Sequence, residues 1–156
     1  MTIAEMLRTV RRVAISTNRL VNDTMAFTAP EMNVKPIISL DEILSTRKMV
    51  DHIHVHEQIR DYIVKIVFAT RQPEQYQLDI KPLIQFGASP RATIMMTLAA
   101  KAWAVLQGRG YVTPQDIKSI GPDVLRHRII MSYEAEAEGV TSDELVKKIF
   151  DTVPVP

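Results

Sequence analysis

Apolar residues in this chain recur mostly three and four positions apart, which is the spacing of a helix with one buried face. Five stretches after residue 35 combine this spacing with helix-starting or helix-ending residues, at about residues 39–50, 57–70, 91–107, 113–125 and 141–150. Capping-box pairs begin two of them, Ser39 with Glu42 and Thr141 with Glu144. The pattern predicts a mainly helical protein.

The first 35 residues carry a different pattern from the rest. Thr2 and Glu5 have the capping-box form, and apolar residues keep helical spacing to about Leu20. From residue 21 to residue 35 the periodicity is lost, which is typical of a linker. We therefore divide the chain into an N-terminal helix with its linker, residues 1–35, and a helical domain, residues 36–156.

Composition agrees with a single all-α core. The chain has 156 residues, 46% of them hydrophobic, with only five glycines and 6% aromatic residues. Such a composition favours helices over a sheet with many tight turns. No internal repeat is visible, so we expect a compact bundle of about five helices, with the additional N-terminal helix and linker, rather than a solenoid.

Charge and cysteine content exclude several classes of function. The 19 basic and 18 acidic side chains leave a net charge of +1, so the overall field demands no polyanionic partner. The chain has no apolar run long enough for a membrane span and no secretory signal, which predicts a cytoplasmic protein with no membrane partner. The absence of cysteine removes disulfides, thiol chemistry and cysteine-ligated zinc.

Three histidines at alternate positions, His52, His54 and His56, raise the question of a metal site. On an extended segment alternate side chains share one face, so the three imidazoles could bind one metal ion. The same alternation would instead direct Ile53 and Val55 into the core and leave the histidines in water. We favour this second interpretation and predict no metal site.

The segment from Gly87 to Ala92 places a cation where the dipole of a helix disfavours one. We expect Ser89 to be the N-cap and Pro90 the first helical residue, which puts Arg91 in the first turn. The helix dipole disfavours a cation there unless an anion is near. Free backbone N–H groups and a forked guanidinium would suit a phosphate, although a solvated or carboxylate-paired arginine is the plainer alternative.

Two basic clusters could contact nucleic-acid phosphates. One comprises four arginines of the first helix and the other lies near residue 127; the members are Arg8, Arg11, Arg12 and Arg19, and Arg126, His127 and Arg128. The near-neutral total charge and the few aromatic residues argue against a nucleic-acid surface. We interpret the first cluster as a solvated face and the second as serving packing or subunit contacts.

The motifs GASPRA, LAAKAWAVLQGRGYVTPQDI and VLRHRI, in this order, resemble the lid of MoxR-family AAA+ ATPases. The resemblance extends over about residues 36–150 and is most specific over residues 86–129. It implies that Arg91 is the sensor-2 arginine, which contacts the terminal phosphates of ATP together with Ser89 and Pro90. It also implies that residues 1–35 join this lid to an ATPase core.

The same resemblance implies what the remainder of such a protein supplies. No Gly-x-x-x-x-Gly-Lys-Ser/Thr loop and no strand ending in Asp-Glu occurs in this chain, so we expect it to be inactive alone. ATP and Mg²⁺ would bind the full-length ATPase. Family members form rings, expected to be hexameric, and work with von Willebrand factor A-type partners in chaperone-like remodelling or maturation. The alternative is a nucleotide-independent helical module that binds protein or nucleic acid.

Overall fold

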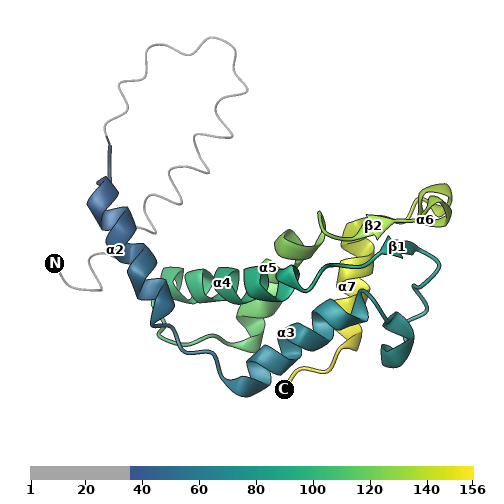
Figure 1. Ribbon diagram of the computed structural model, residues 1–156, viewed down its shortest axis with the longest axis horizontal. Helices are drawn as coiled ribbons and strands as arrows, with labels where there is room; N and C mark the ends of the chain where they lie inside the picture. The colour runs from purple at the N-terminus through teal and green to yellow at the C-terminus, as the bar shows by residue number, and fades with distance from the viewer. Residues whose placement is uncertain (1–35) are drawn as a thin grey trace, which may run out of the picture.

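Six α-helices, one 3₁₀-helix and two short strands make up residues 36–156, which are the residues that the computed structural model describes (Figure 1). The helices are α2 (Leu40–Asp51), α3 (Glu57–Ala69), α4 (Arg91–Leu106), α5 (Pro114–Leu125), α6 (Tyr133–Glu138) and α7 (Ser142–Thr152). The 3₁₀-helix is η1 (Pro73–Tyr76), and the strands are β1 (Ile84–Phe86) and β2 (Ile130–Met131). The predicted helical bundle is confirmed. The helix predicted at residues 2–20 lies outside the described residues.

The predicted starts of three helices are confirmed in atomic detail. Ser39, Thr113 and Thr141 each form a capping box, in which the hydroxyl accepts the N3 amide and the N3 carboxylate accepts the N–H of the cap. Each cap of this kind contributes about 1 kcal/mol to helix stability. These local hydrogen bonds explain why the helix boundaries follow closely from the sequence.

The sequence pattern did not predict helix α6 or the pairing of strands β1 and β2. Helix α6 has six residues, too few to show a helical period, and lies between the cap Ser132 and the left-handed Gly139. Strands β1 and β2 pair antiparallel, with Ile84 opposite Met131 and Phe86 opposite Ile130. The two strands are distant in sequence, so their pairing follows from the tertiary fold rather than from any local pattern.

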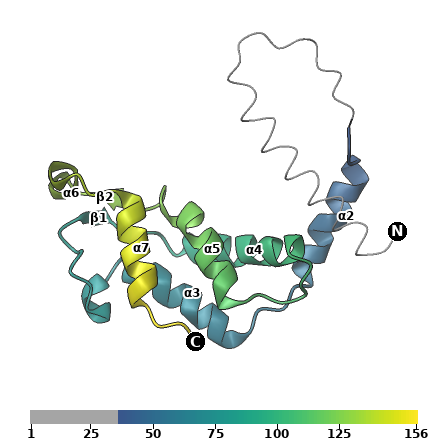
Figure 2. The same cartoon turned by 180° about the vertical axis from the view of Figure 1, so that it is seen from behind.

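The core is built around α3, whose inner face is buried against its neighbours (Figure 2). Helix α4 packs on α3, α5 and α2, and α7 packs on α3 and α5. Small residues on α4, Ala100 and Ala104, have no exposed surface, which permits close approach of its neighbours. The bundle therefore holds α4 by one face and leaves its opposite face accessible.

Helix α2 projects from one end of the bundle (Figures 1 and 2). It packs on α4 and has no buried residue of its own. Its apolar residues Leu40, Ile43 and Leu44 are 70%, 43% and 44% exposed. Within residues 36–156, no helix combines the length and apolar character that crossing a membrane requires.

Tyr62 in α3 provides a test of the core. Its side chain is buried, and this burial raises the pKa of the phenol. Within the described residues its hydroxyl has no hydrogen-bond partner. Because a buried hydroxyl without a partner is costly, we expect Tyr62→Phe to leave the free energy of unfolding unchanged or to raise it by about 1 kcal/mol. Tyr62→Ala, which leaves a cavity, should lower it by roughly 3–5 kcal/mol. Urea denaturation of both variants measures the difference.

Candidate functional site

The start of α4 is attached to the end of α3 by its backbone. The amide of Ala88 donates to the Thr70 hydroxyl over 2.9 Å, and that hydroxyl donates to the Val67 carbonyl over 2.6 Å. A Cβ atom on Gly87 would lie 2.2 Å from the Thr70 carbonyl oxygen, so only glycine permits this approach. Thr70 and Ala88 are both buried. The segment before Arg91 is therefore held in one position.

The predicted role of Ser89 as a capping residue is wrong. Pro90 occupies the N-cap position with helical dihedral angles, φ −55° and ψ −23°, and no side chain caps the helix. The amides of Ala92 and Thr93 instead donate to the carbonyls of Ser89 and Pro90, over 2.8 and 3.1 Å. These backbone bonds satisfy the amides of Ala92 and Thr93 without the Ser89 hydroxyl.

Few donors are left at this helix start for a ligand. Pro90 has no N–H and the amides of Ala92 and Thr93 are occupied, which leaves the amides of Ser89 and Arg91 without a hydrogen bond among residues 36–156. Ser89, Pro90 and Arg91 are exposed, and among residues 36–156 the Arg91 guanidinium has no ion pair or hydrogen bond. The first turn contains no acidic residue. The free cation at the positive end of α4 is thus uncompensated, and the Arg91 guanidinium is available to an anion together with the amides of Ser89 and Arg91.

Apolar side chains continue the exposed face of α4 beyond Arg91. Ile94 and Met95 lie three and four positions further on, so they share its side of the helix, and they are 58% and 41% exposed. Val64 of α3 lines the same shallow pocket as Ile94 and is 48% exposed. A cation beside an apolar strip of this kind is typical of a surface that another domain covers.

Arg71 is a second cation at the segment that precedes α4. Its guanidinium donates to the Ala88 carbonyl over 3.4 Å, and Lys81 Nζ donates to the Arg71 carbonyl over 3.2 Å. No local pattern in the sequence indicates a role for Arg71, because it follows α3 and reaches Ala88 only through the tertiary fold. Its hydrogen bond makes it a residue that positions the segment.

The connection from α4 to α5 is held by a buried carboxylate. Asp116 accepts two hydrogen bonds from Arg109, at 2.8 and 2.5 Å, and two from Thr113, from its amide at 2.7 Å and its hydroxyl at 2.8 Å. Burial by itself would raise the pKa of Asp116, but the hydrogen bonds from Arg109 and Thr113 outweigh it and lower that pKa. Tyr111 is 56% exposed and lies beneath the Arg109 guanidinium.

The lowered pKa of Asp116 predicts a dependence of stability on pH. A carboxylate whose folded pKa lies below its unfolded value of about 3.9 stabilises the fold above that value and loses this contribution as the pH falls through the folded pKa. Asp116→Asn should cost about 2 kcal/mol near pH 7 and reduce the decline in unfolding free energy below about pH 5. Urea denaturation from pH 7 to pH 3 measures both effects, and identical pH profiles for wild type and variant would contradict them.

The histidines have the arrangement that we favoured. His52, His54 and His56 are exposed, whereas Val55 is buried and Ile53 is partly buried. The His56 imidazole accepts the Gln58 amide over 3.3 Å and so begins α3. In the part of the chain that the structure describes, no three histidine, aspartate or glutamate side chains gather in a way that could hold a metal ion.

The basic cluster near residue 127 is engaged in local contacts. Arg126 forms ion pairs with Asp123 at 2.6 Å and with Asp143 at 3.3 Å, which link the end of α5 to the start of α7. Arg128 donates to the Val124 carbonyl over 2.6 Å. These contacts support the packing interpretation. The four arginines of the N-terminal cluster lie outside the described residues.

The sequence of this domain is similar to those of known proteins. Residues 77–149 match the family model described as the AAA lid domain. The chain is 39% identical to Chaperone MoxR1 of Mycobacterium tuberculosis over 133 residues, which are 85% of this chain and 35% of that protein. It is 35% identical to the uncharacterized protein YeaC of Bacillus subtilis over 81% of this chain and 37% of that protein.

A solved structure agrees with these sequence relationships. A crystal structure from Cytophaga hutchinsonii, described as that of an ATPase, superimposes with a TM-score of 0.76 and 39% sequence identity. The match covers 81% of this chain and 40% of that one. The chain thus spans little more than a third of the length of these two curated relatives.

Proposed function

Because the chain belongs to the MoxR family of AAA+ ATPases, as the helical lid domain, we propose that Arg91 contacts the terminal phosphates of ATP in the full-length protein. The observation that carries this proposal is the exposed Arg91 guanidinium, unpaired among residues 36–156, in the first turn of α4. A planar guanidinium can donate two parallel hydrogen bonds to phosphate oxygens. Arg91 would then act as the sensor-2 residue.

The neighbouring residues support a positioning role for the segment rather than a backbone phosphate cradle. With the amides of Ala92 and Thr93 occupied, Ser89 would contribute its hydroxyl and its amide, and Pro90 its fixed turn. Mg²⁺ would be held by the ATPase core, and it neutralises the phosphate charge that develops during transfer. Arg91 would supply positive charge from the lid side of the nucleotide.

The attachment to α3 gives this contact a mechanical consequence. Gly87 and Ala88 are fixed to Thr70, so a force on Arg91 passes to α3 and to the core around it. A rigid lid of this kind would report the presence of the terminal phosphate by moving as a unit. The apolar strip of Ile94 and Met95 would face the domain that holds the nucleotide.

The wider setting of the proposal follows the family. Residues 1–35 would join the lid of residues 36–156 to the ATPase core, and neighbouring subunits would complete a ring, which we propose to be hexameric. The full protein would act in the cytoplasm as a chaperone-like remodelling or maturation ATPase. A von Willebrand factor A-type protein is the proposed partner in that work.

The proposal is tested by measuring ATP turnover by this chain alone, and after mixing with the separately expressed ATPase core of the same parent. Wild-type Arg91 and Arg91→Ala are compared in both assays. We expect no turnover by the chain alone and a stimulation of the core that requires Arg91. Turnover by the isolated chain would reveal a different active site, and an absence of stimulation would favour a nucleotide-independent binding module.

A further inference from the structure

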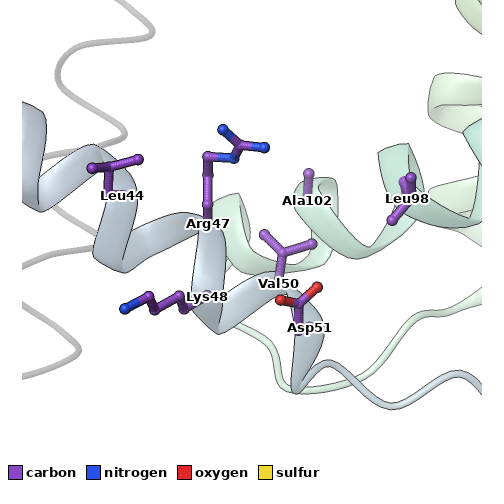
Figure 3. A pocket seen from close by; sticks show the side chains of 7 residues that line it. All are labelled: Leu44, Arg47, Lys48, Val50, Asp51, Leu98 and Ala102. Atoms are coloured by element: carbon purple, nitrogen blue, oxygen red, sulfur yellow. The ribbon is translucent and has the colours of Figure 1, made fainter.

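Helices α2 and α4 cross so that an apolar groove is left open between them. Its floor is formed by Leu44 and Val50 of α2 and by Leu98 and Ala102 of α4, which all lie along the crossing in Figure 3. Leu44 and Leu98 are 44% and 45% exposed. The groove encloses about 570 Å³, enough to receive a large side chain. We call it the α2/α4 groove.

The rim of the α2/α4 groove is positively charged. Arg47 and Lys48 project from α2 (Figure 3), and Lys101 of α4 reaches the backbone of Asp51, which also lines the groove. Among the described residues none of these three cations forms an ion pair, and the Lys101 ammonium donates only to the Asp51 backbone carbonyl, over 3.2 Å. Among residues 36–156, Asp51 is the one acidic residue in the lining. The groove therefore favours an apolar group flanked by carboxylates.

The opposite end of the same chain presents a group of that description. Helix α6 buries Ala135, so a rotation of 100° per residue directs Tyr133 and Ala137 outward. Glu134 and Glu136 flank Tyr133 on its two sides. Tyr133 is 86% exposed, and within the described residues no carboxylate of α6 forms an ion pair. We call α6 with Tyr133 and its flanking glutamates the acidic tip.

Exposed apolar residues extend the acidic tip onto the small sheet. Phe86 of β1 and Ile130 of β2 are paired across the two strands, and they are 61% and 54% exposed. An aromatic residue with apolar support and a charged border is the composition of an interface anchor.

We propose that the acidic tip of one copy of this chain docks in the α2/α4 groove of a second copy. Tyr133 would lie on the floor formed by Leu44 and Leu98, while Glu134 and Glu136 would face Arg47 and Lys48. Apolar contact supplies attraction, and the opposed charges select this partner and orientation. The contact requires no nucleotide and is independent of the proposed role of Arg91.

The positions of the two surfaces determine the type of assembly. Helix α2 lies at one end of the molecule and α6 at the other (Figure 1), so a tip cannot reach the groove of its own chain. Each copy thus offers one groove and one tip, and the contact is head-to-tail. Contacts of this kind continue from copy to copy, and they close into a ring when the rotation between neighbours permits.

Sedimentation velocity of the full 156-residue chain tests the proposal, at concentrations up to about 1 mM because a contact of this size is weak. We expect the mean mass to rise with concentration past that of a dimer. It should be lower at high salt than at low salt, because salt screens the charges. Arg47→Glu with Lys48→Glu, and separately Glu134→Lys with Glu136→Lys, should each weaken association at least about tenfold. Lys147→Glu with Lys148→Glu on α7, the same charge change on exposed residues outside both surfaces, should leave it unchanged.

Combining the variants separates a specific contact from misfolding. In a mixture of Arg47→Glu/Lys48→Glu with Glu134→Lys/Glu136→Lys, each tip meets a groove of opposite charge on the other variant, so the two variants should alternate and regain the growth of the wild type. A single chain that carries all four reversals should regain the growth of the wild type. A wild type that stays monomeric at every concentration and salt overturns the proposal, as does a mixture that remains monomeric or association that survives in both variants.

Discussion

Replacing Arg91 with alanine in the full-length ATPase is expected to lower kcat for ATP hydrolysis by about 10³-fold or more, the range in which arginines that contact a transferring phosphoryl group act. The side chain is exposed, and among residues 36–156 it contributes no ion pair or hydrogen bond to the lid. Its removal should therefore leave the fold and its unfolding free energy within about 0.5 kcal/mol of the wild type. Steady-state turnover and urea denaturation of the same protein separate the two quantities.

Two further variants sharpen this experiment. Arg91→Lys keeps the positive charge but loses the forked geometry, so it should restore only part of the turnover. Lys147→Ala removes an exposed cation from α7 and should hydrolyse ATP at the wild-type rate. Normal hydrolysis by Arg91→Ala would remove the sensor-2 assignment, whereas an equal loss in Arg91→Ala and Lys147→Ala would indicate a general effect of charge.

Gly87→Ala is expected to damage both the stability of the lid and the position of Arg91. The new Cβ would lie 2.2 Å from the Thr70 carbonyl oxygen and 2.9 Å from the Arg71 amide nitrogen, which are backbone atoms that cannot rotate away. The segment must shift, and it would strain the hydrogen bond from Ala88 to Thr70. Overpacking of this kind costs about 1–3 kcal/mol, and a displacement of ~1 Å at a phosphate contact can reduce turnover about 10²-fold.

The matched control for Gly87→Ala is Gly110→Ala. A Cβ on Gly110 would meet no atom of the described residues within 4 Å, so the same added methyl group should be neutral or slightly stabilising. Thermal unfolding of both variants gives the stabilities, and ATP turnover in the full-length protein gives the effect on Arg91. Equal stability of the two variants would show that the start of α4 is not held against α3 as described.

Local chemistry explains most of what the sequence by itself determined. The capping boxes at Ser39, Thr113 and Thr141 involve residues three positions apart, so they are visible in sequence and begin α2, α5 and α7 where expected. The buried side chains of α3 recur at helical spacing, which predicted its inner face. The motif around Arg91 carried the family resemblance, and the comparisons confirm that family.

Only the tertiary structure decided which groups meet at the site. Thr70 and Arg71 reach Ala88 across 18 and 17 positions of the chain, and no local pattern indicates such a contact. The start of α4 uses backbone carbonyls in place of the Ser89 hydroxyl, a choice that depends on the dihedral angles of Pro90. The pairing of β1 with β2 likewise joins distant segments. Helix caps and apolar periodicity involve residues close together in the sequence, so the sequence alone reveals them. The contacts at the site join residues far apart in the sequence, so they depend on how the helices pack.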